Sequence, residues 1–250
     1  MLIDAYLLGG LLNHTLHICI HDFTHFSGHS NLFFNKVMAV ICNIPIGIPS
    51  AIPFGKYHSY HHNFFGEMNV DPDLPLKWET ELAYKFKGYK FLFYTFIEFF
   101  YACRPVFMSN TTITLGELVN VAVVFSIDYL IYLSWGPSAI LFIAVAGLSS
   151  IGPHPAAIHI IAEHYEFIPG MESYDYIGIW NFFNLDVGYH IEHHDFPNAP
   201  WYNLRKIRAI APEFYEYLPH HTSYFQIIKK FLTNPNFNLF FRTIRVPPKS

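Results

Sequence analysis

The stretch Gly188-Tyr189-His190-Ile191-Glu192-His193-His194-Asp195-Phe196-Pro197 places three histidines at positions i, i+3 and i+4. On an α-helix these positions share one face, so the three imidazole rings would point to the same side. Two earlier stretches have related spacing. His58-Ser59-Tyr60-His61-His62 repeats it, and His21-Asp22-Phe23-Thr24-His25 has the i, i+4 version. We call these three stretches the histidine boxes.

The number of histidines in the boxes indicates two metal ions rather than one. Neutral imidazole binds iron, copper, zinc and nickel well. A single zinc ion is usually satisfied by four ligands, whereas the boxes offer twice that number. A lone histidine on an apolar helix is more often a packing residue, but three boxes in one apolar chain favour a shared metal site. The candidate ligands are His21, His25, His58, His61, His62, His190, His193 and His194.

The composition favours a membrane protein. Of the 250 residues, 52% are hydrophobic and 14% are charged, against about 25% charged in a typical soluble domain. Because helices satisfy their own backbone hydrogen bonds in lipid, we predict an all-α integral membrane protein with one domain, residues 1–250. The net charge of −4 gives no basis for nucleic-acid binding. Cys19, Cys42 and Cys103 form no CxxC, so we predict free thiols.

Several apolar runs are long enough to enter a bilayer. Leu2 to Ile20 could cross it, and its polar stripe, which includes His14 and His17, should then face the protein interior. Residues 37–54 carry three prolines and predict a broken or interfacial segment. Residues 91–107 are rich in aromatic side chains and resemble an interfacial amphipathic helix as much as a membrane span. Residues 117–135 and 138–151 flank the turn Gly136-Pro137 and predict a transmembrane hairpin.

The basic residues predict an orientation. No Lys or Arg lies between Arg104 and Arg205, whereas seven lie from Lys36 to Arg104 and eight from Arg205 to Lys249. By the positive-inside rule, both basic regions face the cytosol. All three boxes then lie on the cytosolic side, with the segment after Pro197 as a cap of short helices. The sequon at Asn110 should therefore carry no glycan.

Acidic residues beside the boxes are candidates for orienting the ligands. A metal-bound histidine usually donates its other ring N–H to a carboxylate or carbonyl group. We expect Asp22, Glu163, Glu192 and Asp195 to be such acceptors. The alternative for each is a carboxylate that is only hydrated by water in a polar loop. Two iron ions held by histidines would suit oxygen activation, because non-haem iron sites leave positions open for O2. Removing hydrogen from an alkyl carbon needs such an oxidant, since that carbon has no usable acidity.

The boxes HDFTH, HSYHH and HIEHH resemble those of membrane fatty-acyl desaturases and hydroxylases. The resemblance to the sphingolipid Δ4-desaturases, also called dihydroceramide desaturases, is closer still. It rests on the boxes together with residues 43–49, residues 161–165, Arg104-Pro105 and residues 187–198, and it covers nearly the whole chain.

The resemblance implies a function and a site. The enzyme would use O2 to place a trans C4–C5 double bond in dihydroceramide, giving ceramide, with a di-iron centre in a cytosolic cap. Electrons would come from NADH through cytochrome b5 reductase and cytochrome b5, at the endoplasmic reticulum membrane. The eight box histidines would be ligands. A ninth ligand would precede the third box: His164 matches it best, and His159 ranks second. The roles of His154 and His159 stay open.

The chain differs from the resembled family at its start, and other functions compete. Family members carry about one more spanning segment and an amphiphilic leader, whereas Met1 lies 20 residues before His21, so we expect a short N-terminus. The nearest alternative is a sphingolipid C4-hydroxylase that forms phytoceramide, or a bifunctional enzyme. A non-catalytic sphingolipid-binding protein and a metal transporter are alternatives from other classes. Transporter ligands should lie near the bilayer midplane, however, and the boxes are predicted at its cytosolic edge.

Overall fold

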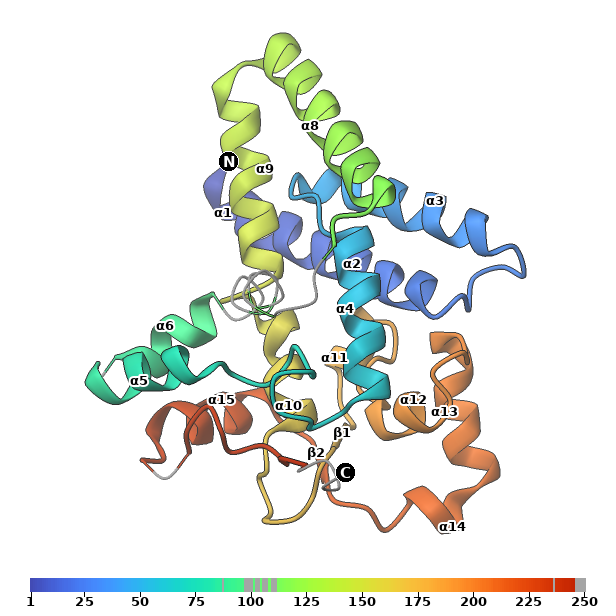
Figure 1. The fold of residues 1–250 in the computed structure, drawn as a ribbon, viewed down its shortest axis with the longest axis vertical. Coiled ribbons are helices and arrows are strands. Elements are labelled where there is room, and N and C mark those ends of the chain that lie inside the picture. Colours follow the sequence, from blue (N-terminus) through green and yellow to red (C-terminus); the bar gives the residue numbers. More distant parts are fainter. Residues whose placement is uncertain are drawn as a thin grey trace.

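The computed structural model describes residues 1–86, 88–96, 101, 104, 108, 112–235 and 237–245. Within them the chain is mainly helical, as predicted (Figure 1). The expectation of an all-α fold needs one correction. Residues 175–176 (β1) and 220–221 (β2) form a short parallel pair, with Asp175 opposite His220 and Tyr176 opposite His221. The predicted sequon at Asn110, Cys103 and much of residues 97–107 lie outside the described residues.

The N-terminal segment is helical from its second residue. It consists of α1 (Leu2–Asp4), the π-helical turn η1 (Ala5–Gly9) and α2 (Gly10–Thr24). Its polar stripe faces the interior as predicted, because Asn13, His14 and His21 are buried while Leu8 and Leu12 are exposed. This segment is not among the candidate membrane spans of the described chain, so its crossing of the membrane stays a prediction.

The proline-rich segment is broken, as predicted. It comprises α3 (Leu32–Asn43), the 3-10 turn η2 (Ile44–Ile46) and α4 (Ala51–Asn63), with a bend of 116°. Pro45 and Pro49 remove backbone donors at the break. Asn43 stabilises the bend, because its side chain accepts hydrogen bonds from the amides of Ser50 and Ala51 and donates one to the Ile48 carbonyl.

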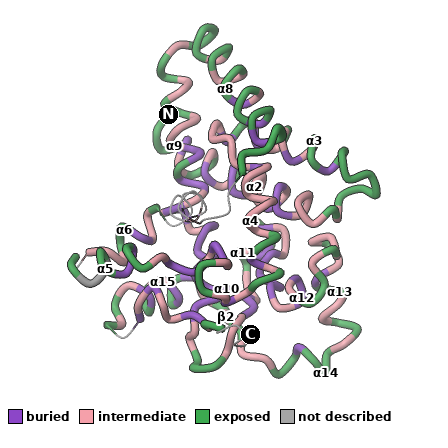
Figure 2. The backbone as a smooth tube through the Cα atoms, in the orientation of Figure 1, coloured by how far each residue is buried: buried purple, intermediate pink, exposed green. Residues whose placement is uncertain are grey.

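The predicted hairpin is the most apolar part of the described chain. Its helices are α8 (Leu115–Trp135) and α9 (Pro137–Ser150), joined at Gly136. Thr114 begins α8 through a capping box with Glu117. Two segments are long and apolar enough to span a membrane, 115–135 and 137–164, and the bent pair 32–63 would be a third. Figure 2 shows that exposed residues are frequent along this hairpin, as lipid contact requires.

The remaining elements form a layer of short helices at the end of the molecule opposite the hairpin turn (Figure 1). The core of this layer includes Ile161, Tyr165, Ile227, Phe231 and Phe237. Its helix α6 includes the start of the predicted amphipathic run, residues 91–107. The elements are α5 (Lys77–Lys85), α6 (Tyr89–Thr95), η3 (Pro155–Ile158), α10 (His159–His164), α11 (Trp180–Phe183), α12 (His190–Asp195), α13 (Trp201–Ile210), α14 (Pro212–Tyr215) and α15 (Tyr224–Thr233).

Candidate metal centre

Nine predicted histidines gather between α2, α4, α10 and α12, in two clusters. The first cluster takes ligand nitrogens from three helices, and all of these atoms lie within 4.8 Å of one another. Its members are His21, His25, His58, His62 and His193. The second cluster meets the same limit with His61, His164 and His194. His190 joins it, because its Nε2 lies 2.9 Å from His164 Nε2.

The helical geometry divides each HxxHH box between the two clusters. On α4, His58 and His62 are four residues apart and serve the first cluster, while His61 serves the second. On α12 the division is reversed, since His193 serves the first cluster and His194 the second. Adjacent residues of a helix point about 100° apart, so neighbouring histidines cannot serve one ion equally well. The spacing HxxHH therefore suits two metal ions.

The distances within the clusters fit metal coordination. Nε2 atoms lie 3.0 Å apart for His58 and His62, 3.1 Å for His62 and His193, and 3.0 Å for His61 and His164. Two nitrogens about 2.1 Å from one metal and at right angles to each other would be about 3.0 Å apart. The buried Nε2 atoms of His25 and His194 have no hydrogen-bond partner among the described residues. Buried polar atoms are usually paired, so these atoms suit a metal.

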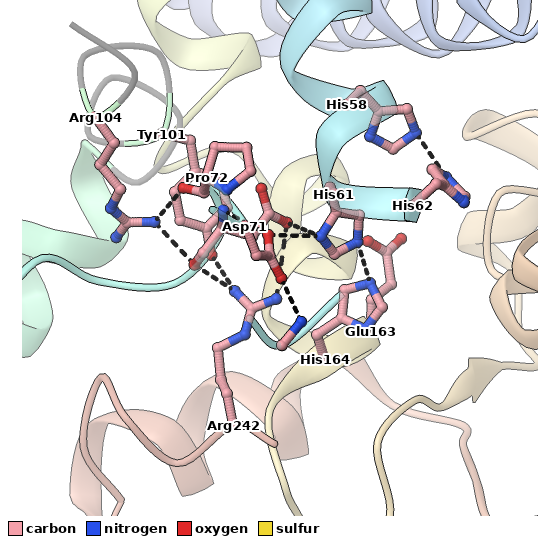
Figure 3. Close-up of polar contacts among 12 residues, drawn as sticks. His58, His61, His62, Asp71, Pro72, Tyr101, Arg104, Glu163, His164 and Arg242 are labelled. Carbon is pink, nitrogen blue, oxygen red and sulfur yellow. Dashed lines mark hydrogen bonds and ion pairs between the residues drawn. The ribbon is translucent and has the colours of Figure 1, made fainter. Parts of the chain in front are cut away.

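Asp71 supports the second cluster from outside, which the sequence did not predict (Figure 3). His61 Nδ1 lies 3.0 Å from Asp71 Oδ1, so the carboxylate orients the ring. Burial raises the pKa of Asp71, but His61 and Arg242 outweigh burial and hold that pKa below its ordinary value. The only sequence signal for the role of Asp71 is that it lies in an acidic, turn-rich stretch directly after the second box. Taken alone, that stretch predicts only a loop.

Two buried arginines hold this loop in place. Arg104 pairs with Glu79 at 2.8 Å and donates to the Asp73 carbonyl at 2.9 Å. Arg242 donates to the same carbonyl at 2.9 Å. Figure 3 shows Asp71 between His61 and Arg242, with Arg104 farther from the histidines. The loop that carries Asp71 is therefore anchored by charge-assisted hydrogen bonds.

Of the four acidic residues predicted to orient ligands, only Glu163 lies beside a predicted ligand ring. Its Oε1 is 3.6 Å from His190 Nδ1 and is hydrogen-bonded to His159 Nδ1. For the other three, the contacts found among the described residues lead to groups other than the clustered rings, so the prediction was wrong. Asp22 accepts from the Trp201 amide, Glu192 pairs with Arg208, and Asp195 accepts from the Tyr215 hydroxyl.

The other histidines lie outside both clusters. His159 Nε2 is 3.0 Å from His14 Nε2, and His154 Nδ1 accepts from the Ala156 amide. Among the two predicted candidates for a ninth ligand, the structure thus brings His164, not His159, to a cluster. The thiols of Cys19 and Cys42 are free, and neither belongs to the clusters found in the described chain.

The sequence matches one protein family over most of its length. The profile of the fatty acid desaturase family matches residues 2–226. The chain belongs to the fatty acid desaturase family. Membership implies a histidine-ligated iron centre, and the two clusters supply the histidines for it.

Two curated relatives are similar over nearly the whole chain. The sphingolipid delta(4)-desaturase of Drosophila melanogaster is 38% identical over 239 residues, which cover 94% of this chain and 74% of that protein. The sphingolipid delta(4)-desaturase/C4-monooxygenase of Homo sapiens is 36% identical over 248 residues, which cover 98% of this chain and 76% of that protein. No solved structure matches the chain significantly.

Proposed function

We propose that this desaturase-family chain is a sphingolipid Δ4-desaturase that converts dihydroceramide to ceramide. The observation that carries the proposal is the convergence of nine histidines into two clusters in a chain that resembles sphingolipid desaturases over nearly its full length. The reaction removes one hydrogen each from C4 and C5 of the sphinganine chain. O2 accepts these hydrogens together with two electrons and two protons, and leaves as two water molecules.

The proposed ligands are the nine clustered histidines, His21, His25, His58, His61, His62, His164, His190, His193 and His194. Two iron ions, when bound, supply the activation of O2 that hydrogen removal from an unactivated C–H bond needs. The protein holds the rings in place from α2, α4, α10 and α12. It also limits water at the centre, because His61 is 1% exposed and His193 is 2% exposed.

The setting of the reaction is part of the proposal. The basic segments on both sides of the hairpin support a cytosolic location of the boxes and the cap. Electrons would then reach the centre from NADH through cytochrome b5 reductase and cytochrome b5, at the endoplasmic reticulum membrane. The candidate spans and the lipid-exposed hairpin support a multi-pass membrane protein.

A second candidate activity is C4-hydroxylation, which would give phytoceramide. It is favoured by one observation, the name of the human relative, which includes both activities. The two outcomes diverge over whether a second hydrogen leaves or oxygen is transferred. A difference of about 1.4 kcal/mol between the two barriers changes the product ratio tenfold.

The test is lipid mass spectrometry of cells that lack their own ceramide desaturase and express this chain. We expect ceramide with a C4–C5 double bond, and its loss in His193→Ala, because the first cluster then lacks a ligand. The matched control is His220→Ala, an exposed histidine outside both clusters.

Three results would change the proposal. Phytoceramide alone would identify a hydroxylase. A well-expressed chain that yields neither product, but binds dihydroceramide, would identify a binding protein. Equal ceramide formation by wild type and His193→Ala would exclude the proposed centre.

A further inference from the structure

Three buried side chains that are not proposed as ligands connect the second cluster to α2 and α9. His14 lies on α2, and His159 and Glu163 lie one helical turn apart on α10. They are 2%, 7% and 8% exposed. Burying so many ionisable groups is costly unless each is paired, so their contacts need an explanation.

The contacts form one continuous chain of polar atoms. His14 Nδ1 lies 2.7 Å from the Ser150 carbonyl oxygen, at the end of α9. His14 Nε2 lies 3.0 Å from His159 Nε2, and His159 Nδ1 is hydrogen-bonded to Glu163 Oε1. The same Glu163 oxygen is 3.6 Å from Nδ1 of His190, whose Nε2 reaches His164. This series of contacts thus ends at the predicted ligands His190 and His164.

Proton counting shows that the three hydrogen bonds of His14, His159 and Glu163 can all be satisfied, whereas His190 Nδ1 has no hydrogen-bond partner among the described residues and faces Glu163 at 3.6 Å. The Ser150 carbonyl can only accept, so His14 Nδ1 carries a proton. Each of the three hydrogen bonds needs one proton, and two imidazoles with one carboxyl group hold these three protons while staying electrically neutral overall. Both nitrogens of His159 and both nitrogens of His14 are then occupied. Unlike the clustered histidines, neither residue belongs to a group of three or more close ligand atoms among the described residues.

We infer that His14, His159 and Glu163 are positioning residues that fix the ring of His190 in the second cluster. The inference rests on the proposed iron centre. It explains why His159, although close to the third box in space, is not a ligand. Because α2 also carries His21 and ends directly before His25, both of the first cluster, the same contacts connect the second cluster to the helix that positions part of the first.

The test measures iron retention by purified protein against increasing chelator concentration, with Mössbauer spectra of the loaded protein. His159→Phe and His14→Phe keep a ring of similar size but remove hydrogen bonds. Both lose the contact between His14 and His159, His159→Phe also loses the contact with Glu163, and His14→Phe also loses the contact with the Ser150 carbonyl. We expect both variants to bind two irons and to release one of them at 10- to 100-fold lower chelator concentration, the usual effect of losing a partner of a ligand. The Mössbauer signal of that iron alone should change.

The matched comparisons are His164→Ala, which should lose one iron without chelator, and His220→Phe, which should behave as wild type. Size-exclusion chromatography in detergent selects the folded fraction of each variant. The inference is overturned if both variants retain iron as wild type does, or if His159→Phe behaves as His164→Ala and is thus a ligand. A wild-type chain without iron would overturn the proposed centre as well, so the two failures are distinguishable.

Discussion

At the scale of single residues, the number of ligand nitrogens that meet at a site separates a candidate ligand from other buried histidines. His61 has Asp71 at Nδ1, and its Nε2 faces His164 in a group that also includes His194. His159 likewise has a carboxylate at Nδ1, from Glu163, but its Nε2 faces only His14, and neither ring belongs to a group of three or more close ligand atoms among the described residues. The surrounding ligand atoms therefore indicate the role of each ring, and burial alone does not.

Asp71→Asn should weaken iron binding at the second cluster by about 10- to 100-fold. Three N–H groups, from His61, Gly66 and Asp73, converge on the two Asp71 oxygens. An amide offers one oxygen, so one of these N–H groups would face another donor. Iron content of the purified variant against chelator concentration measures the effect. Asp186→Asn, at a surface ion pair with Arg205, is the control, and an identical titration of both variants would contradict the role of Asp71.

At the scale of elements, the break between α3 and α4 places the second box. Pro45 and Pro49 end the regular helix, and Gly47 adopts φ 70°, a conformation that other residues enter at a cost. The bend of 116° turns α4 toward α12, where histidines of both helices meet. A straight helix would carry the box away from the other ligands.

Gly47→Ala should destabilise the protein more than Gly170→Ala. Both glycines have positive φ, so each alanine costs about 1–2 kcal/mol of folding free energy. Only at position 47 would the new methyl group overlap Ile143 on α9, whereas nothing lies within 4 Å at position 170. Overpacking adds about 1–3 kcal/mol. Thermal unfolding in detergent should show the larger fall in Tm for Gly47→Ala, and equal shifts would contradict the close packing.

At the scale of the whole molecule, the hairpin and the helical layer divide the chain into an apolar end and a polar end (Figure 1). The exposed hairpin residues include Leu118, Phe125, Leu130 and Trp135. The opposite end carries Arg205, Lys206 and Lys229. Such a division orients a protein in a membrane through its charges.

Labelling of sealed microsomes tests the proposed orientation. We expect a membrane-impermeant maleimide to react with Thr222→Cys in sealed vesicles, and with Ser138→Cys only after detergent opens them. Both side chains are exposed, and Ser138 lies beside the hairpin turn while Thr222 follows β2. The native cysteines are first replaced by alanine. The reverse labelling pattern would place the histidine boxes in the lumen.

The box spacing by itself predicted a metal site built from histidines on helices, because i, i+3 and i+4 spacing is a property of the local backbone. Hydropathy likewise predicted the α8–α9 hairpin, and the prolines predicted the broken segment. Only the tertiary structure decided how nine histidines divide into two clusters and which acidic residues face them. Asp71 lies in the loop that follows the second box, but Arg104 and Arg242 are far from it along the chain, and nothing local relates these arginines to the loop. Hydrogen-bond partners depend on contacts between distant segments, so the packing of α4, α10 and α12 against one another determines them.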